Sequence, residues 1–358
     1  MISLIKNIQI ASLVYNGSRI TTQLFSTNTK LHLETEVKEV ILKYLDGKDN
    51  GIVVLGLNRP NTRNAFGKNL VSQLNNAIST IKQDDKLRVL IIRSLVPFVF
   101  CAGADLYERL KMSKSEVSEF VTSLRNIMND IESISIPVIS AIDGVALGGG
   151  LELALATDIR IAALEAKLGL VETKLAIIPG AGGTQRLPRI VGSAIAKELI
   201  YTARILNGQQ AKNIHLVNEV VLQNKNGDAA YQAALSLARE ILPNGPIGVK
   251  LAKEAISKGI EMSIEDGLEI EKQCYNKVIN TEDRLEGLSA FTAKRVPIYK
   301  GLIPVRGDSL IRGELPRRAV FHSLRDFVTG LITDIVCPLS RKGIGKGGNA
   351  EGSGLSSF

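Results

Sequence analysis

The sequence of 358 residues contains no tryptophan, and aromatic residues make up only 4% of it. Aromatic rings are the surfaces on which single-stranded nucleic acids stack, so a binding site of that kind is poorly supplied. Only three histidines occur, His32, His215 and His322, and none lies near another in the sequence. This scarcity disfavours a multi-histidine metal site and a histidine-based catalytic triad, and we expect no bound metal.

Cysteines and long apolar runs are equally scarce. The three cysteines, Cys101, Cys274 and Cys337, are far apart and form no CxxC pair, which disfavours a disulfide framework or a zinc site and indicates a reducing compartment. We expect Cys101 to be a packed small hydrophobic residue and not a nucleophile. No uninterrupted apolar run reaches the roughly 18 residues of a membrane-spanning helix, so no membrane span is predicted.

Acidic residues are absent from the first 33 positions, where Lys6, Arg19 and Lys30 are scattered among Ser, Thr, Asn and Ile. That composition predicts a transit peptide over residues 1–33 and a location in the mitochondrial matrix. Residues 302–358 carry eight Lys/Arg against five Asp/Glu and end in a run rich in glycine and serine. We predict an atypical, partly disordered extension there, with a short amphipathic helix around residues 321–336. The net charge of +8 therefore lies largely at the ends and gives little support for a nucleic-acid surface on the core.

The segment between the ends predicts an α/β domain followed by helices. Short apolar runs predict strands at residues 51–57, 89–93, 99–101, 137–141, 159–162 and 168–170. Apolar residues at helical spacing predict helices at residues 68–82 and 113–133, and Ser113 with Glu116 predicts a capping box for the second. From residue 192 onwards the pattern is mainly helical, with segments at residues 227–242, 248–259 and 263–280.

Two glutamates close to glycine clusters are the strongest sign of chemistry. Glu152 follows the run Gly148-Gly149-Gly150, and Glu172, twenty residues further on, precedes a proline and the cluster at residues 180–183. Glycines let the backbone approach a ligand closely, and N–H groups at a helix start favour a developing oxyanion. Two carboxylates beside such a pocket can handle a proton and a water together, so the pattern predicts chemistry next to a carbonyl.

Each of these features has a simpler explanation when taken alone. A glycine run before a helix is more often a tight turn, Glu152 could be a solvated first-turn acid, and Glu172 could be a surface carboxylate. The joint occurrence of the AGAD segment at residues 102–105, a DG pair at residues 143–144 and the two glutamates favours a functional site instead. Asp158 and Arg160, which lie between the glutamates, are predicted to be structural.

Three motifs in this order carry a family resemblance: FCAGADL at residues 100–106, ALGGGLELALATDIRIA, and IPGAGGTQRLPR. Together they resemble the crotonase (enoyl-CoA hydratase/isomerase) superfamily, and the closing stretch RLEGLSAFTAKRVPIYKG is most similar to its methylglutaconyl-CoA hydratase family. The resemblance implies an α/β crotonase (ClpP/crotonase-like) spiral of ββα units over residues 34–235. It further implies a helical C-terminal trimerisation region over residues 236–301, and assembly as a homotrimer or a hexamer, a dimer of trimers.

The resemblance also implies roles for individual residues. The backbone N–H groups of Ala104 and Gly149 would form an oxyanion hole for a thioester carbonyl. Glu152 would help activate a water that both glutamates hold, and Glu172 would exchange a proton with the α-carbon, so that water adds syn. Phe291 and Lys294 would reach the coenzyme A site of a neighbouring subunit. The implied substrate-binding and coenzyme A-binding positions are Arg63, Ala65, Ala102, Asp105, Leu106, Gly148, Gly180, Phe291 and Lys294; coenzyme A is part of the substrate, and no separate cofactor is implied.

The implied substrate is an acyl-CoA thioester, and the methylglutaconyl-CoA hydratase family points to conversion of 3-methylglutaconyl-CoA to 3-hydroxy-3-methylglutaryl-CoA in leucine degradation. A short-chain enoyl-CoA hydratase of fatty-acid β-oxidation is the alternative, while the presence of both glutamates argues against an isomerase that uses a single acid. Members of the family are also known as AU-rich-element RNA-binding proteins. Since the helix at residues 68–82 has lysines only at its ends, we expect at most weak, non-specific RNA binding. A last alternative is that residues 302–358 block assembly and leave a non-catalytic chain.

Overall fold

The computed structural model describes residues 38–302 of the chain. The transit peptide predicted at residues 1–33 and the helix predicted around residues 321–336 lie outside the described residues. The predicted extension also lies outside them, apart from Leu302. The description that follows concerns residues 38–302 alone.

The larger of two sheets has six strands in the order β1-β2-β3-β5-β7-β9. All neighbouring strands are parallel except β1, which runs antiparallel to β2 at one edge. Every residue of β2 and of β5 is buried, which is typical of parallel strands that are covered on both faces. The strands are β1 (Val40–Tyr44), β2 (Ile52–Leu57), β3 (Val89–Ser94), β5 (Val138–Ile142), β7 (Ile159–Ala163) and β9 (Glu219–Val221).

A second, three-stranded parallel sheet contains β4 (Val99–Cys101), β6 (Val145–Leu147) and β8 (Lys167–Gly169). The pairs β3–β4, β5–β6 and β7–β8 each supply one strand to the large sheet and the next strand to the small one. Helices follow each pair: α2 (Leu106–Leu110) and α3 (Lys114–Glu132), then α4 (Gly149–Leu155), then α5 (Gly183–Val191). The predicted spiral of ββα units is therefore confirmed, and the predicted capping box at Ser113 is present at the start of α3.

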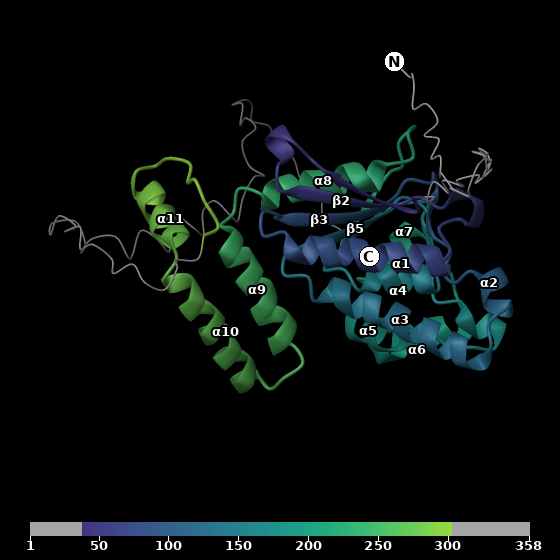
Figure 1. Cartoon of the computed structure of the whole chain (residues 1–358). Coiled ribbons are helices and arrows are strands. Elements are labelled where there is room, and N and C mark those ends of the chain that lie inside the picture. The colour runs from purple at the N-terminus through teal and green to yellow at the C-terminus, as the bar shows by residue number, and fades with distance from the viewer. Residues whose placement is uncertain (1–37, 303–358) are drawn as a thin grey trace, which may run out of the picture. The chain divides into compact units, whose positions relative to one another are not determined.

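Helices cover both faces of the large sheet, as Figure 1 shows. The α1 (Lys68–Gln83), α3 and α4 helices lie on one face, where Leu55 and Leu57 of β2 share a core with Leu70 and Leu74 of α1. The α8 helix (Ala229–Ile241) lies on the other face, against the residues of β2 that point the opposite way. The boundary predicted between residues 235 and 236 lies within α8, whose alanines pack closely on the sheet, and the division of the chain at this boundary stays a prediction.

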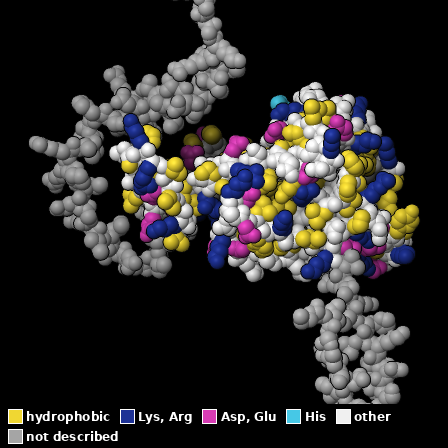
Figure 2. Space-filling model, turned by 90° about the horizontal axis from the view of Figure 1, so that it is seen from above, with side chains coloured by type: hydrophobic (Ala, Val, Ile, Leu, Met, Phe, Trp, Pro, Cys, Tyr) yellow, Lys and Arg dark blue, Asp and Glu magenta, His cyan; other side chains and the backbone are white. Residues whose placement is uncertain are grey.

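The remaining helices are α6 (Ser193–Thr202), α7 (Gly208–Asn213), α9 (Pro246–Gly259), α10 (Ile264–Ile279) and α11 (Glu282–Thr292). The α9 and α10 helices pack against each other, yet α10 buries only Cys274. Figure 2 shows hydrophobic side chains among the charged ones on the surface of this helical part. Several hydrophobic residues of this helical part are each more than half exposed to solvent: Ile256, Ile260, Ile264, Leu268, Tyr275, Leu285, Leu288 and Phe291.

Every strand and helix predicted for the middle of the chain is present, with ends shifted by a few residues. The strands β1, β6 and β9 were not predicted. The β6 and β9 strands have only three residues each, too few to show a period of two, and β1 is a partly exposed edge strand. Tertiary pairing with a neighbouring strand, and not local pattern, makes these segments extended.

Replacement of Gly150 by alanine should disrupt the packing of α4 against β4. A Cβ atom on Gly150 would lie 2.1 Å from the carbonyl oxygen of Cys101, a contact that requires the backbone to move. We expect Gly150→Ala to lower the free energy of unfolding by about 3 kcal/mol or to prevent folding. Urea denaturation followed by circular dichroism measures the change.

The matched control is Gly248→Ala in α9, where a Cβ atom would meet nothing within 4 Å. Because alanine favours the helix interior, this variant should gain about 0.5–1 kcal/mol. A Gly150→Ala variant as stable as the control would contradict the close packing described here.

Candidate active site

Two turns that contain glycine meet at the end of the small sheet. Gly103 follows β4 and has a φ of +97°, and Gly148 follows β6 with a φ of +53°. A Cβ atom on Gly103 would lie 2.9 Å from the carbonyl oxygen of Leu147 and 3.4 Å from the amide nitrogen of Gly149. Both the positive φ and the close approach require glycine here. The turns therefore bring the segment of Ala104 directly beside Gly149.

The N–H groups of Ala104 and Gly149 are available to a ligand. Phe66 forms a parallel bridge with Ala104, in which Phe66 donates to the carbonyl of Gly103 at 2.7 Å and accepts from the N–H of Asp105 at 3.0 Å. In such a bridge the N–H of Ala104 itself points away from Phe66. Within residues 38–302, no protein acceptor is bonded to the N–H of Ala104 or of Gly149. Two adjacent free donors of this kind can bind one carbonyl oxygen.

Glu152 lies on α4 with only 3% of its surface exposed. Its Oε1 atom accepts from the backbone N–H of Ala181 at 2.8 Å and from that of Gly183 at 2.7 Å. Its Oε2 atom accepts no hydrogen bond from the part of the chain that the structure describes. Burial raises the pKa of this carboxyl, while the two N–H donors and the charges of Arg186 and Arg125 counteract part of that rise. The carboxylate is thus held by one oxygen, and its other oxygen is available to a water or a substrate.

Glu172 begins a short 3-10 helix after β8, and its Oε2 atom is buried without a hydrogen-bond partner among the described residues. Burial raises the pKa of Glu172 to about 7, and the negative charge of Glu152 adds to the rise. A Cβ atom on Gly148 would lie 3.2 Å from Oε1 of Glu172, so this carboxyl lies directly over the glycine turn. The two glutamates act on each other electrostatically and titrate as a pair that retains a proton near neutral pH.

The predicted coenzyme A-binding positions Arg63 and Ala65 run beside the segment of Ala104. The N–H of Ala102 donates to the carbonyl of Arg63 at 3.0 Å, and Asn64 donates through its amide to the carbonyl of Phe100 at 2.9 Å. Arg63 and Asn64 both have positive φ values, of 53° and 55°. The structure therefore brings four of the predicted positions together, which are Arg63, Ala65, Ala102 and Asp105.

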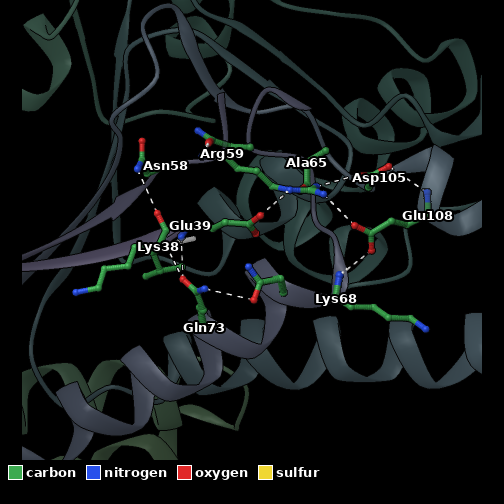
Figure 3. A network of polar contacts seen from close by, with 12 residues as sticks. Lys38, Glu39, Asn58, Arg59, Ala65, Lys68, Gln73, Asp105 and Glu108 are labelled. Atoms are coloured by element: carbon green, nitrogen blue, oxygen red, sulfur yellow. Dashed lines mark hydrogen bonds and ion pairs between the residues drawn. The ribbon is translucent and has the colours of Figure 1, made fainter. Parts of the chain in front are cut away.

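The Arg59 side chain fixes this arrangement, as Figure 3 shows. Its guanidinium donates to the carbonyl of Ala65 at 2.7 Å and pairs with Asp105 at 2.8 Å. It also pairs with Glu39 at 3.1 Å and with Glu108 at 2.9 Å. Sequence reasoning missed the role of Arg59, because its partners come from three separate segments. An arginine directly before Pro60 at the end of a strand was the one local signal.

The carboxylate of Asp105, predicted to lie in the substrate site, is engaged within the protein. Besides Arg59, it accepts from the N–H groups of Tyr107 and Glu108, both at 3.1 Å, and so forms the N-cap of α2. The pKa of this carboxyl is lowered, because these N–H groups and the Arg59 charge outweigh the effect of burial. Its side chain therefore positions α2, while Leu106, the next predicted residue, is partly exposed at the start of that helix.

Gly180, Phe291 and Lys294 differ in where the structure places them. Gly180 packs against α3, where a Cβ atom would lie 2.8 Å from Cγ1 of Val121, and it directly precedes the Ala181 N–H that binds Glu152. Phe291 lies on α11 and Lys294 just after it, and Figure 1 shows α11 well apart from α4. Within one chain, these two residues are not brought to the glutamates. Their predicted role in a neighbouring subunit stays a prediction.

The residues predicted to be structural make structural contacts. Cys101 is fully buried, its Sγ donates to the carbonyl of Asn64, and burial raises the pKa of its thiol to about 12. Asp158 accepts from the N–H of Val138 at 2.7 Å and from Lys253 at 2.6 Å, and buried Arg160 donates to two backbone carbonyls. Over residues 38–302, no group of three potential ligands could hold a metal ion. No helix within this range is long and apolar enough to cross a membrane.

Comparison with known proteins identifies the family of this chain. The profile of the family described as enoyl-CoA hydratase/isomerase matches residues 47–302. The chain belongs to the enoyl-CoA hydratase/isomerase family. It is an enzyme of the hydratase type, a carbon–oxygen lyase that acts on acyl-CoA thioesters, and the crotonase fold predicted from its motifs is confirmed.

Three relatives illustrate the similarity. The chain is 57% identical over 270 residues to mouse "Methylglutaconyl-CoA hydratase, mitochondrial", a match that covers 75% of this chain and 86% of that protein. It is 53% identical over 270 residues to mouse "Enoyl-CoA hydratase domain-containing protein 2, mitochondrial", covering 75% of this chain and 91% of that protein. The crystal structure of enoyl-CoA hydratase from Bacillus anthracis matches with a TM-score of 0.70 and 47% identity, covering 74% of this chain and all of that one.

The charge of Glu172 should destabilise the folded protein at alkaline pH. Since folding raises its pKa from 4.5 to about 7, the folded state binds more protons than the unfolded state between these values, and stability falls as pH rises through this window. Glu172→Gln removes the charge, so we expect it to raise the free energy of unfolding by about 2 kcal/mol at pH 8, a value reduced for partial solvent screening. The difference should largely vanish at pH 4.

Chemical denaturation of both proteins at the two pH values measures this effect. Glu165→Gln, a replacement of an exposed glutamate in the same part of the chain, serves as the control and should show no such pH-dependent gain. An equal effect of Glu172→Gln at pH 4 and at pH 8 would argue against a buried, protonated Glu172.

Proposed function

We propose that this chain hydrates 3-methylglutaconyl-CoA, giving 3-hydroxy-3-methylglutaryl-CoA, and that Glu152 and Glu172 carry out the proton transfers. One observation carries the proposal: the buried Glu152 and the half-buried Glu172, whose Oε2 atom is buried, lie beside the turn that presents the free N–H groups of Ala104 and Gly149. A carbonyl oxygen bound at these N–H groups places the adjacent carbon–carbon double bond next to both carboxyls.

The oxyanion hole makes the double bond reactive. When the thioester oxygen accepts from Ala104 and Gly149, it can take up the negative charge that develops as water attacks the β-carbon. The product of that attack is an enolate-like state at the thioester. Loss of one such donor typically raises the barrier by about 3–4 kcal/mol, so the two N–H groups supply a large part of the rate enhancement.

The two glutamates divide the proton transfers. Glu152, as a carboxylate, takes a proton from the water whose oxygen bonds to the β-carbon, and Glu172, as a carboxylic acid, gives its proton to the α-carbon. The raised pKa of Glu172 supports this assignment, because an acid must hold its proton at neutral pH. One proton is on the pair before and after the reaction, so the same protonation state serves hydration and dehydration.

The choice of 3-methylglutaconyl-CoA is supported by the 57% identity to proteins named for that reaction. Short-chain enoyl-CoA hydration in fatty-acid β-oxidation is the alternative. The relatives named methylglutaconyl-CoA hydratase carry "mitochondrial" in their names, which supports a mitochondrial location, and we propose the matrix as the compartment.

RNA binding is proposed only as a weak second activity. Both lysines of α1 pair with acids of α3: Lys68 with Glu116 at 3.2 Å, and Lys82 with Asp130. Paired lysines release fewer counterions on contact with phosphates, so affinity should be low. Filter binding that stayed tight and selective for AU-rich RNA at physiological salt would refute this assignment.

We propose that residues 236–301 assemble the chain as a homotrimer or as a hexamer. Support comes from the exposed apolar side chains of α9, α10 and α11, which a monomer would leave in water. Phe291 and Lys294, at the end of this region, would then reach the coenzyme A site of a neighbouring subunit. In that arrangement the active site needs more than one copy of the chain.

A charge on the exposed face of α11 should weaken this assembly. Leu285 and Leu288 are more than half exposed and lie three positions apart, so they share one face of the helix. We expect Leu288→Asp to shift the chain toward monomer in size-exclusion chromatography with light scattering. The control is Leu222→Asp, which charges an exposed leucine outside the C-terminal helices and should leave the assembly unchanged.

Hydratase activity is tested with residues 34–358, by following loss of the conjugated enoyl absorbance of 3-methylglutaconyl-CoA and crotonyl-CoA. We expect Glu152→Gln and Glu172→Gln each to lower kcat by about 10²–10⁴-fold, because each removes one proton transfer. Glu165→Gln should retain full activity. Preference for crotonyl-CoA would favour the β-oxidation alternative. Full activity of Glu152→Gln or of Glu172→Gln would refute the mechanism.

A further inference from the structure

A single peptide group links Arg125 to the catalytic carboxylate Glu152. Arg125 lies on α3, and its Nε and Nη2 atoms donate to the carbonyl oxygen of Gly180 at 3.2 Å and 3.0 Å. The other end of that peptide group is the N–H of Ala181, which donates to Oε1 of Glu152 at 2.8 Å. Because the carbonyl oxygen and amide nitrogen of a peptide group are only about 2.3 Å apart, the guanidinium lies within about 8 Å of that carboxylate oxygen.

Arg125 has no acidic partner among the described residues. The contrast with Arg186, the other arginine whose charge acts on Glu152, is informative. Arg186 pairs with Glu132 at 2.6 Å and also donates to Asn129, so its charge is compensated. Arg125 thus brings an uncompensated positive charge to the carboxylate of Glu152.

The guanidinium of Arg125 also has unused donors. An arginine has five N–H donors, and the carbonyl of Gly180 is the only acceptor bonded to Arg125 within residues 38–302. The donors that remain include one on each terminal nitrogen, the arrangement that binds a carboxylate through both of its oxygens. The side chain is exposed, so an incoming ligand can reach these donors.

The position of Arg125 matches the length of a dicarboxylic acyl chain. In 3-methylglutaconyl-CoA, the free carboxyl carbon lies two bonds beyond the β-carbon, the atom that the Glu152-bound water attacks in the proposed mechanism. That carboxylate therefore lies only a few ångströms beyond the attacked carbon, and the guanidinium of Arg125 lies within about 8 Å of Oε1 of Glu152. Val121, one helical turn before Arg125, packs against Gly180 and keeps the loop against α3.

We infer that Arg125 is a specificity-determining residue that binds the free carboxylate of a dicarboxylic enoyl-CoA and selects it over chains that end in a methyl group. The inference rests on the proposed hydratase function. An acyl chain that ends in a methyl group accepts no hydrogen bond from the guanidinium and is not attracted by its positive charge. Selection by a charged, hydrogen-bonded group is much stronger than selection by one methylene in an apolar pocket.

The experiment compares Arg125→Gln and Arg125→Lys with the unaltered chain on two substrates that differ only in the carboxyl group, 3-methylglutaconyl-CoA and 3-methylcrotonyl-CoA. Crotonyl-CoA serves as a third substrate. For Arg125→Gln, we expect kcat/KM to fall by about 100-fold on 3-methylglutaconyl-CoA. On the other two substrates we expect a much smaller and equal fall, which comes only from the lost hydrogen bond to Gly180 and the lost charge near Glu152. Arg125→Lys, which keeps the charge but loses the two-oxygen contact, should fall between. Lys114→Gln removes one charge from the same helix and should change none of the three values.

A binding measurement gives a second readout that does not depend on turnover. By titration calorimetry, the unaltered chain should bind the saturated 3-methylglutaryl-CoA more tightly than isovaleryl-CoA, and Arg125→Gln should abolish that difference. An equal fall in kcat/KM on all three substrates would show a structural role instead, and unchanged values would show none; either result overturns the inference. The inference is also overturned if the unaltered chain does not bind 3-methylglutaryl-CoA more tightly than isovaleryl-CoA.

Failure of the proposed function gives a different result. If the unaltered chain hydrates none of the three thioesters, both the function and the inference are wrong. If it hydrates crotonyl-CoA in a manner that depends on Glu152 and Glu172, while Arg125→Gln changes no selectivity, only the inference is wrong.

Discussion

The close contact between two backbone turns is the constraint on which the site depends. The chain after β4 and the chain after β6 approach so closely that a Cβ atom at Gly103 would overlap the carbonyl oxygen at the end of β6, and one at Gly150 would overlap that at the end of β4. This approach places the N–H groups of Ala104 and Gly149 beside each other and starts α4 at the point where Glu152 enters the core. The ββα repeat makes the contact possible, because it sends consecutive short strands to the same small sheet.

Two sets of polar groups surround this contact: the ion pairs of Arg59 stabilise it, and the carboxyls of Glu152 and Glu172 lower the stability of the folded chain. Arg59 binds three carboxylates and the carbonyl of Ala65, and so fixes the predicted coenzyme A-binding position Ala65 and the helix α2 near Ala104. Burial raises the pKa of Glu152 and that of Glu172, and the negative charge of Glu152 raises the pKa of Glu172 further, so the doubly charged state is disfavoured. In the proposed mechanism the pair of carboxyls holds one proton, so this destabilisation belongs to the proposed chemistry.

The order of the elements could be predicted from the sequence, because apolar spacing is a local signal. The glycine clusters and short motifs also marked Glu152, Glu172 and the segments of Ala104 and Gly149 as candidates, and the structure brings these candidates close together. The partners of Arg59 and of Arg125 could not be predicted, since Glu39, Asp105 and Gly180 come from segments that meet only in the folded chain. The same holds for β6 and β9, whose three residues become strands through pairing with distant neighbours.

The central claim is that the N–H groups of Ala104 and Gly149 polarise a thioester carbonyl. The most direct test is the infrared spectrum of an enoyl-CoA with a carbon-13-labelled thioester carbonyl, bound to the Glu152→Gln/Glu172→Gln double variant, which cannot turn it over. Two strong donors should shift the carbonyl stretch to lower frequency than in buffer, beyond the isotope effect alone. A bound thioester with an unshifted carbonyl stretch would contradict the account.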